Sequence, residues 1–113
     1  MFRKFFHKEI NPYNVTDVVV FRNMDERLML IVKADAGTLV VGIKQVYEKI
    51  ATLTDAATDQ EKAAAARMFA DAMFGQEQGA KLCEFYGDPL TVIKVCGEYF
   101  KRLSKKITKA QKR

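Results

Sequence analysis

The sequence contains few of the side chains that catalysis and metal binding use. Its 113 residues include one histidine, His7, one serine, Ser104, and two cysteines, Cys83 and Cys96. A nucleophile needs a base and an orienting group within reach, and a zinc site needs several cysteines or histidines at ligand spacing. The glycines also lack the spacing of phosphate-binding loops. We therefore predict that the protein is not an enzyme and that it has no cofactor and no metal site.

Long apolar runs are also missing. The longest apolar stretch, residues 28–47, is interrupted by Lys33, Asp35 and Lys44, whereas a membrane-spanning helix needs about 20 residues with almost no charge. The basic first residues are not followed by the apolar run of a signal peptide. We expect a cytoplasmic protein without membrane association, in which both cysteines are reduced and lie in the core.

Two prolines and six glycines are too few for a disordered or fibrous chain, and 49% apolar residues suffice for one compact core. The sequence divides into an N-terminal arm or strand, residues 1–22, and a helical domain, residues 23–113. In the first part, residues 11–14 predict a turn, and the β-branched run 15–21 is long enough for a strand. A lone strand is not stable. This run therefore either pairs with a strand, which a second copy or a partner could supply, or leads into a helix.

The second part begins with a helix signal. Asn23 followed by Glu26 has the form of a capping box, which predicts a helix that starts near Met24. Residues 35–38 predict a break or kink in this helix, because glycine is unfavourable in a helix interior. Beyond the break, apolar residues recur at steps of four and three and are expected to pack against another helix: Leu39, Ile43, Val46, Ile50 and Leu53.

Three further helices are predicted over residues 59–74, 76–86 and from residue 89 onward. Their limits are set by a second capping box, two helix-ending glycines and an Asp-Pro start: Thr58 with Glu61, Gly75, Gly87 and Asp88-Pro89. The last helix carries an apolar stripe formed by Leu90, Ile93, Cys96 or Gly97, Phe100, Leu103, Ile107 and Ala110. The predicted fold is all-α, a small bundle of four to five helices together with a short N-terminal strand or arm.

Charge is distributed unevenly along the chain. Residues 23–100 carry eight Lys or Arg against twelve acids, whereas residues 101–113 carry seven Lys or Arg and no acid. On a helix, four of these cations fall on one side: Arg102, Lys105, Lys106 and Lys109. Such a face suits an acidic partner helix or a phosphate backbone, and it is also typical of a solvated, fraying terminus. The acidic body and the lack of a recognition module argue against nucleic acid as the partner.

The start of the chain combines aromatic and basic residues. Phe2, Phe5 and Phe6 have helical spacing and lie among Arg3, Lys4 and Lys8. This segment either docks on a partner or a membrane surface, or folds back on the core.

Residues 69–75, residues 80–88 and the final amphipathic helix resemble the small tail assembly chaperones of long-tailed bacteriophages. The shared pattern is a helix that ends at Phe74-Gly75, a short helix that ends in an aromatic residue and Gly87, and a basic last helix. The resemblance covers about residues 39–110. It implies a non-enzymatic helical protein of the bacterial host cytoplasm, encoded by a phage or prophage. Such a protein binds the long, helical tape measure protein and keeps it soluble during tail assembly.

An apolar groove between helices is a common receptor for an amphipathic helix such as a tape measure segment. Six apolar residues are candidates to line such a groove, and each is equally a candidate for the core: Leu39, Ile43, Val46, Ile50, Phe69 and Met73. With the four cations of the last helix they form the predicted partner-binding set. The predicted partner is the tape measure protein or another helical client, and a homo-oligomer stays open. The alternative function is a small helical nucleic-acid-associated or regulatory protein that uses its basic C-terminus.

Overall fold

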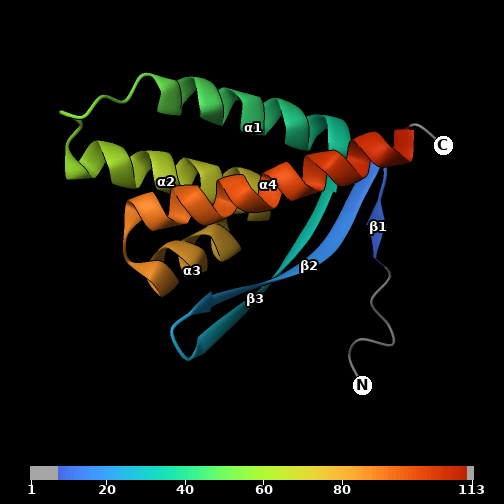
Figure 1. Cartoon of the computed structure of the whole chain (residues 1–113), viewed down its shortest axis with the longest axis horizontal. Helices are drawn as coiled ribbons and strands as arrows, with labels where there is room; N and C mark the ends of the chain where they lie inside the picture. Colours follow the sequence, from blue (N-terminus) through green and yellow to red (C-terminus); the bar gives the residue numbers. More distant parts are fainter. Residues whose placement is uncertain (1–7, 112–113) are drawn as a thin grey trace.

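The computed structural model describes residues 8–111, and within this range the chain forms three strands and four helices (Figure 1). The strands are β1 (Glu9–Ile10), β2 (Asn14–Asn23) and β3 (Glu26–Asp35). They form an antiparallel sheet in the order β1-β2-β3. The helices are α1 (Ala36–Ala51), α2 (Asp59–Phe74), α3 (Gln76–Tyr86) and α4 (Pro89–Gln111). The prediction of an all-α bundle is therefore wrong, because a sheet of three strands accompanies the helices.

The largest correction concerns residues 23–35, where a helix was expected to start near Met24. Residues 26–35 form β3 instead. Asn23 of β2 pairs with Glu26 of β3, and Met24 and Asp25 between them make the two-residue turn of the hairpin. Met24 has a φ of 57°, the left-handed conformation that such tight hairpin turns require. The capping-box pattern is therefore a hairpin turn in this protein.

Of the two alternatives for residues 15–21, the strand is the one that forms. It pairs with β1 and β3 of the same chain, and not with a second copy or a partner. Residues alternate between the two faces of the hairpin, so that Val15, Val19 and Phe21 of β2 are buried. On β3, Leu30 and Val32 are buried in the same way. A period of two in the buried positions is the property of a sheet with one covered face.

The predicted helix limits after residue 50 are confirmed. Thr58 and Glu61 make a full capping box at the start of α2. Gly75 and Gly87 end α2 and α3 with φ values of 85° and 75°, which an L side chain rarely adopts. The expected break at residues 35–38 is the junction of β3 and α1, where the Asp35 carboxylate accepts a hydrogen bond of 2.9 Å from the backbone N–H of Thr38.

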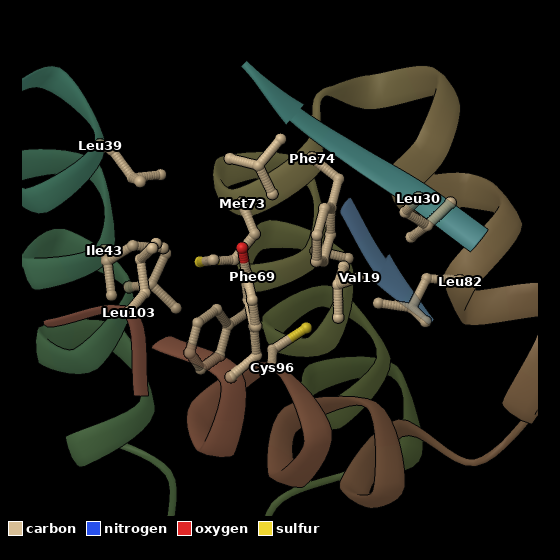
Figure 2. Packing of buried hydrophobic residues seen from close by; sticks show 14 of the residues in the cluster. Val19, Leu30, Leu39, Ile43, Phe69, Met73, Phe74, Leu82, Cys96 and Leu103 are labelled. Atoms are coloured by element: carbon tan, nitrogen blue, oxygen red, sulfur yellow. The ribbon is translucent and has the colours of Figure 1, made fainter. Parts of the chain in front are cut away.

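One hydrophobic core joins the sheet to the helices. Figure 2 shows Val19 and Leu30 of the hairpin directed toward side chains of the helices, including Phe74 and Leu82. Phe69 of α2 is fully buried within this cluster. Helices α1 and α4 both pack on α2, and α3 packs on α2 and on β3. The layer of helices therefore covers one face of the sheet (Figure 1).

Helix α3 is attached to the hairpin by side-chain hydrogen bonds. The Gln78 amide accepts a bond from Ile31 N–H at 2.9 Å and donates one to Ile31 C=O at 2.7 Å. The Asn23 amide donates to Phe85 C=O, and the Tyr86 hydroxyl donates to Arg22 C=O. Gln78 thus occupies the hydrogen-bonding position that another strand would take beside β3.

Two sets of predictions concern residues outside the described range. The aromatic segment with Phe2, Phe5 and Phe6 lies before residue 8, and the last two cations, Lys112 and Arg113, lie after residue 111. Within the described part of the chain, none of the helices has both the length and the apolar character needed to cross a bilayer.

Candidate functional site

A groove runs along one side of α4, on the flank of that helix nearest Tyr47 of α1. Its volume is about 840 Å³. Apart from Tyr47, all the residues that line it belong to α4: Ile93, Lys94, Gly97, Glu98, Phe100, Lys101, Ser104, Lys105, Thr108 and Lys109. From residue 93 to residue 109, α4 extends about 24 Å. The groove is therefore long enough for several turns of a second helix.

The floor of the groove is apolar and aromatic. Tyr47, which is 42% exposed, packs edge-on against Phe69, with 5.5 Å between the ring centroids, and in a tilted arrangement against Phe100, with 6.1 Å between the centroids. Partial burial, followed by a contribution from Cys96, raises the pKa of the Tyr47 hydroxyl, so this hydroxyl is neutral at physiological pH. Gly97 adds no side chain, and a Cβ atom built there would lie 3.9 Å from the Tyr47 hydroxyl oxygen. The floor is therefore open above Gly97.

The wall of the groove on the solvent side of α4 is cationic. Four exposed lysines follow one another along the helix, and Glu98 is the one acid among the lining residues: Lys94, Lys101, Lys105 and Lys109. Lysine presents a flexible ammonium group that can follow a moving carboxylate. The groove thus combines an apolar floor with a row of positive charges.

The structure separates the four predicted cations of α4 into two groups. Lys105 and Lys109 line the groove. Arg102 and Lys106 instead line a smaller hollow of about 210 Å³ between α4 and β2, where Lys8 also lies. Arg102 sits 6.0 Å above the centre of the Tyr99 ring in this hollow.

The predicted apolar binding residues lie mostly in the core. Five of the six have an exposed fraction of 3% or less, and Ile50 is half-buried against the same cluster: Leu39, Ile43, Val46, Phe69 and Met73. Figure 2 shows Leu39, Ile43, Phe69 and Met73 packed among side chains from other elements. The alternative stated for these residues, packing in the core, describes their positions in the folded chain.

A buried carboxylate lies at the base of the smaller hollow. Asp17 of β2 is 3% exposed, and its Oδ2 accepts a hydrogen bond of 2.7 Å from the Tyr99 hydroxyl. Its Oδ1 is 3.2 Å from Lys8 Nζ, an ion pair whose geometry is not that of a hydrogen bond. Burial first, then the hydrogen bond to Asp17 and its charge, raise the pKa of the Tyr99 hydroxyl. Tyr99 is therefore a permanent donor to Asp17.

The cysteines are free thiols in the structure, with Cys96 buried and Cys83 half-buried. Burial, followed by the proximity of Cys83, raises the pKa of Cys96 to about 12. The reactive thiolate form of Cys96 is thus scarce at neutral pH. Within residues 8–111, no three His, Cys, Asp or Glu side chains lie together where they could hold a metal ion.

Sequence reasoning missed the floor of the groove. Ile93 and Phe100 belong to the apolar stripe that the sequence predicts for the last helix, and both pack against the core. The stripe is wider than the core it covers, and its edge faces the groove. Tyr47 is absent from the predicted binding residues, although it directly follows Val46, which is one of them. Its place beside α4 depends on how α1 and α4 both pack on α2. Comparisons of the chain with protein-family models, with curated proteins and with solved structures find no match.

Proposed function

We propose that this protein is a tail assembly chaperone of a long-tailed phage or prophage, which binds the tape measure protein and keeps it soluble until the tail tube forms. The observation that carries the proposal is the groove along α4, with its apolar floor at Tyr47, Ile93 and Phe100. A tape measure segment is a long amphipathic helix, and such a helix exposes an apolar stripe that aggregates unless it is covered.

The helix pattern that resembles this family gives a second line of support. Helix α2 ends at Phe74 before Gly75, α3 ends at Tyr86 before Gly87, and α4 is long and basic. The sheet of residues 9–35 lies outside the region of resemblance, which begins at about residue 39. The proposal therefore rests on the helical part of the chain.

The groove provides a means of reversible binding. A client helix that lies along α4 removes its apolar stripe and the rings of Tyr47 and Phe100 from water, which favours association in proportion to the area covered. The groove is open along its length and is formed by exposed or half-buried side chains. A bound helix can therefore leave the groove without any unfolding of the core. A chaperone needs such release, because it must hand over its client.

The test is co-expression of the full chain with helical segments of a tape measure protein. We expect more soluble segment and its co-purification with the chain. Gly97→Leu extends a side chain into the groove and should reduce co-purification, whereas Gly97→Ala adds only a Cβ that meets its neighbours at ordinary contact distance and should not. A segment that gains no solubility and does not co-purify with the wild-type chain contradicts the proposal.

The second candidate function is nucleic-acid binding, which the many cations of α4 favour, with Lys101, Arg102, Lys105, Lys106 and Lys109 all exposed. A titration with duplex DNA at increasing salt tests it, because neutralised phosphates make affinity fall steeply as salt rises. Tight binding with a steep salt dependence would support this function over the chaperone role. The apolar floor of the groove has no place in that interaction, whereas a client helix uses it.

A further inference from the structure

The two sides of the groove differ in character, and this difference specifies the kind of helix that fits. On one side Tyr47, Ile93 and Phe100 form an apolar surface. On the other side α4 presents its lysine row, defined as Lys94, Lys101, Lys105 and Lys109. An occupant needs an apolar stripe next to a flank of opposite charge, because a lysine row facing basic side chains is repulsive.

The length of the lysine row sets the length of the occupant. Lys94 and Lys109 are fifteen residues apart on one helix, which corresponds to about 22 Å. A helix that pairs with the whole row therefore needs about 15 residues, or about four turns. Its acidic residues must recur along one flank at steps of three and four.

The arrangement of the rings favours a helix over single-stranded nucleic acid. A base stacks on the free face of an aromatic ring, but the Tyr47 ring already packs against Phe69 and Phe100. The lining of the groove also includes Glu98, whose charge opposes a phosphate backbone. Apolar side chains of a helix can pack on ring edges and on Ile93 without a free ring face.

We propose that the groove selects an acidic amphipathic helix of about four turns, with its apolar stripe on Tyr47, Ile93 and Phe100 and its carboxylates along the lysine row. This inference rests on the proposed function in so far as the groove is the client site, and it specifies the chemistry of the client segment. The charge of the client flank then decides which segments of a long helical protein are bound.

The experiment measures binding of the full chain to synthetic helical peptides by fluorescence anisotropy at low salt. One peptide carries glutamates beside an apolar stripe, a second carries lysines at the same positions, and a third has the composition of the first in scrambled order. We expect the glutamate peptide to bind about tenfold or more tightly than the other two, since each exposed ion pair contributes a modest factor. Equal binding of the glutamate and lysine peptides overturns the inference.

Charge-reversal variants of the chain test the role of the lysine row in peptide binding. The double variant Lys101→Glu, Lys105→Glu should bind the glutamate peptide about tenfold more weakly and the lysine peptide more tightly than the wild type does. The matched control is Lys44→Glu with Lys81→Glu, which reverses two exposed lysines outside the groove lining and should leave both affinities unchanged. Unchanged peptide binding in the groove variant, or an equal loss of binding in the control variant, overturns the inference. An oligonucleotide that competes with the glutamate peptide and binds more tightly than it does also overturns the inference.

The outcome is separable from that of the chaperone proposal. If a tape measure segment co-purifies with the chain and the Lys101→Glu, Lys105→Glu variant retains it, the chaperone role stands and the charge selection fails. If the glutamate peptide binds in the groove but no tape measure segment is solubilised, the charge selection stands and the chaperone role fails.

Discussion

Asp17 is a charged side chain in the core, and the Tyr99 hydroxyl is its closest partner, at 2.7 Å. Tyr99→Phe removes this donor and leaves the ring in place. Because a hydrogen bond to a buried charge contributes about 1.5–3 kcal/mol, we expect the free energy of unfolding to fall by about that amount. Urea denaturation measures it, with Tyr13→Phe at a 75% exposed position as the control. Equal stability of the two variants would show that Asp17 does not depend on Tyr99.

Three carboxylates next to helix starts have pKa values held below their ordinary range. Hydrogen bonds from Thr38, Thr58 and Thr91 lower the pKa values of Asp35, Glu61 and Asp88, respectively. Their ordinary values are 3.8 for the two aspartates and 4.5 for Glu61. Since the folded pKa lies below the unfolded one, the stabilisation is complete above the unfolded pKa and is lost as pH falls through the folded pKa.

We therefore predict that the melting temperature falls as pH is lowered below about 4.5. Asp35→Asn with Asp88→Asn keeps capping side chains, because asparagine caps helices about as well as aspartate. These amides do not titrate, so the double variant should lose less stability between neutral pH and pH about 3. Thermal melts across this range are the measurement. A double variant with the pH profile of the wild type would contradict the assignment.

At the scale of elements, the contact between α3 and β3 depends on Gln78. Its amide is the hydrogen-bonding partner of both backbone groups of Ile31. Gln78→Ala leaves these groups without that partner, which is expected to cost about 1–3 kcal/mol. It also leaves an unpaired sheet edge, so we expect association that grows with protein concentration. Thermal melts and size-exclusion chromatography detect the two effects, with Gln76→Ala at an exposed position as the control.

No loss of stability in Gln78→Ala would mean that water satisfies Ile31 equally well. A stable variant that stays monomeric at high concentration would further show that α3 covers the edge without the amide. Gln76→Ala keeps the wild-type behaviour under either result.

The hairpin also shows where sequence patterns are ambiguous. Leu28, Ile31 and Val32 fit a helix face, whereas Leu28, Leu30 and Val32 fit the covered face of a strand, and the same apolar run contains both periods. The pairing of β3 with β2 decides between them, and this is a tertiary interaction that a local pattern does not contain. The caps at Thr58, Gly75 and Gly87 could be predicted because each acts through its own neighbouring backbone.

The residues of the candidate site also divide into those that the sequence could predict and those that it could not. Lys105 and Lys109 could be predicted as a cationic face because α4 alone sets their positions. The groove floor could not, since Tyr47 comes from α1 and meets Phe100 only after both helices pack on α2. For Leu39 and the other apolar candidates, the sequence left two alternatives, the groove lining and the core, and the fold of the whole chain decides between them.

At the scale of the whole molecule, the sheet and the helices share one core. Leu30 of β3 is 1% exposed, and Leu30→Ala should cost about 2–5 kcal/mol, a large part of the typical stability of about 5–15 kcal/mol. We expect the helices to melt with the hairpin in one transition. Far-UV circular dichroism and tyrosine fluorescence should give the same midpoint. Met29→Ala, on the open face of the same strand at 52% exposure, is the control.

Separate midpoints for the two signals would show that the helical layer is stable without the hairpin. A shift as large in Met29→Ala as in Leu30→Ala would show that position on the strand, and not burial, determines the loss.

The hydrogen bond from Tyr99 to Asp17 joins residues 82 positions apart. Closing a loop of that length costs about 4 kcal/mol in chain entropy, whereas the β2–β3 hairpin and the α2–α3 pair close over short loops. We therefore expect the local units to form early in folding and α4 to dock on β2 late. Because α4 carries nearly all of the lining residues of the groove, we expect a partly folded chain to lack this groove. If the groove is the client site, as proposed, binding competence is expected only once folding is complete, and folding intermediates of the protein are not expected to compete for its client.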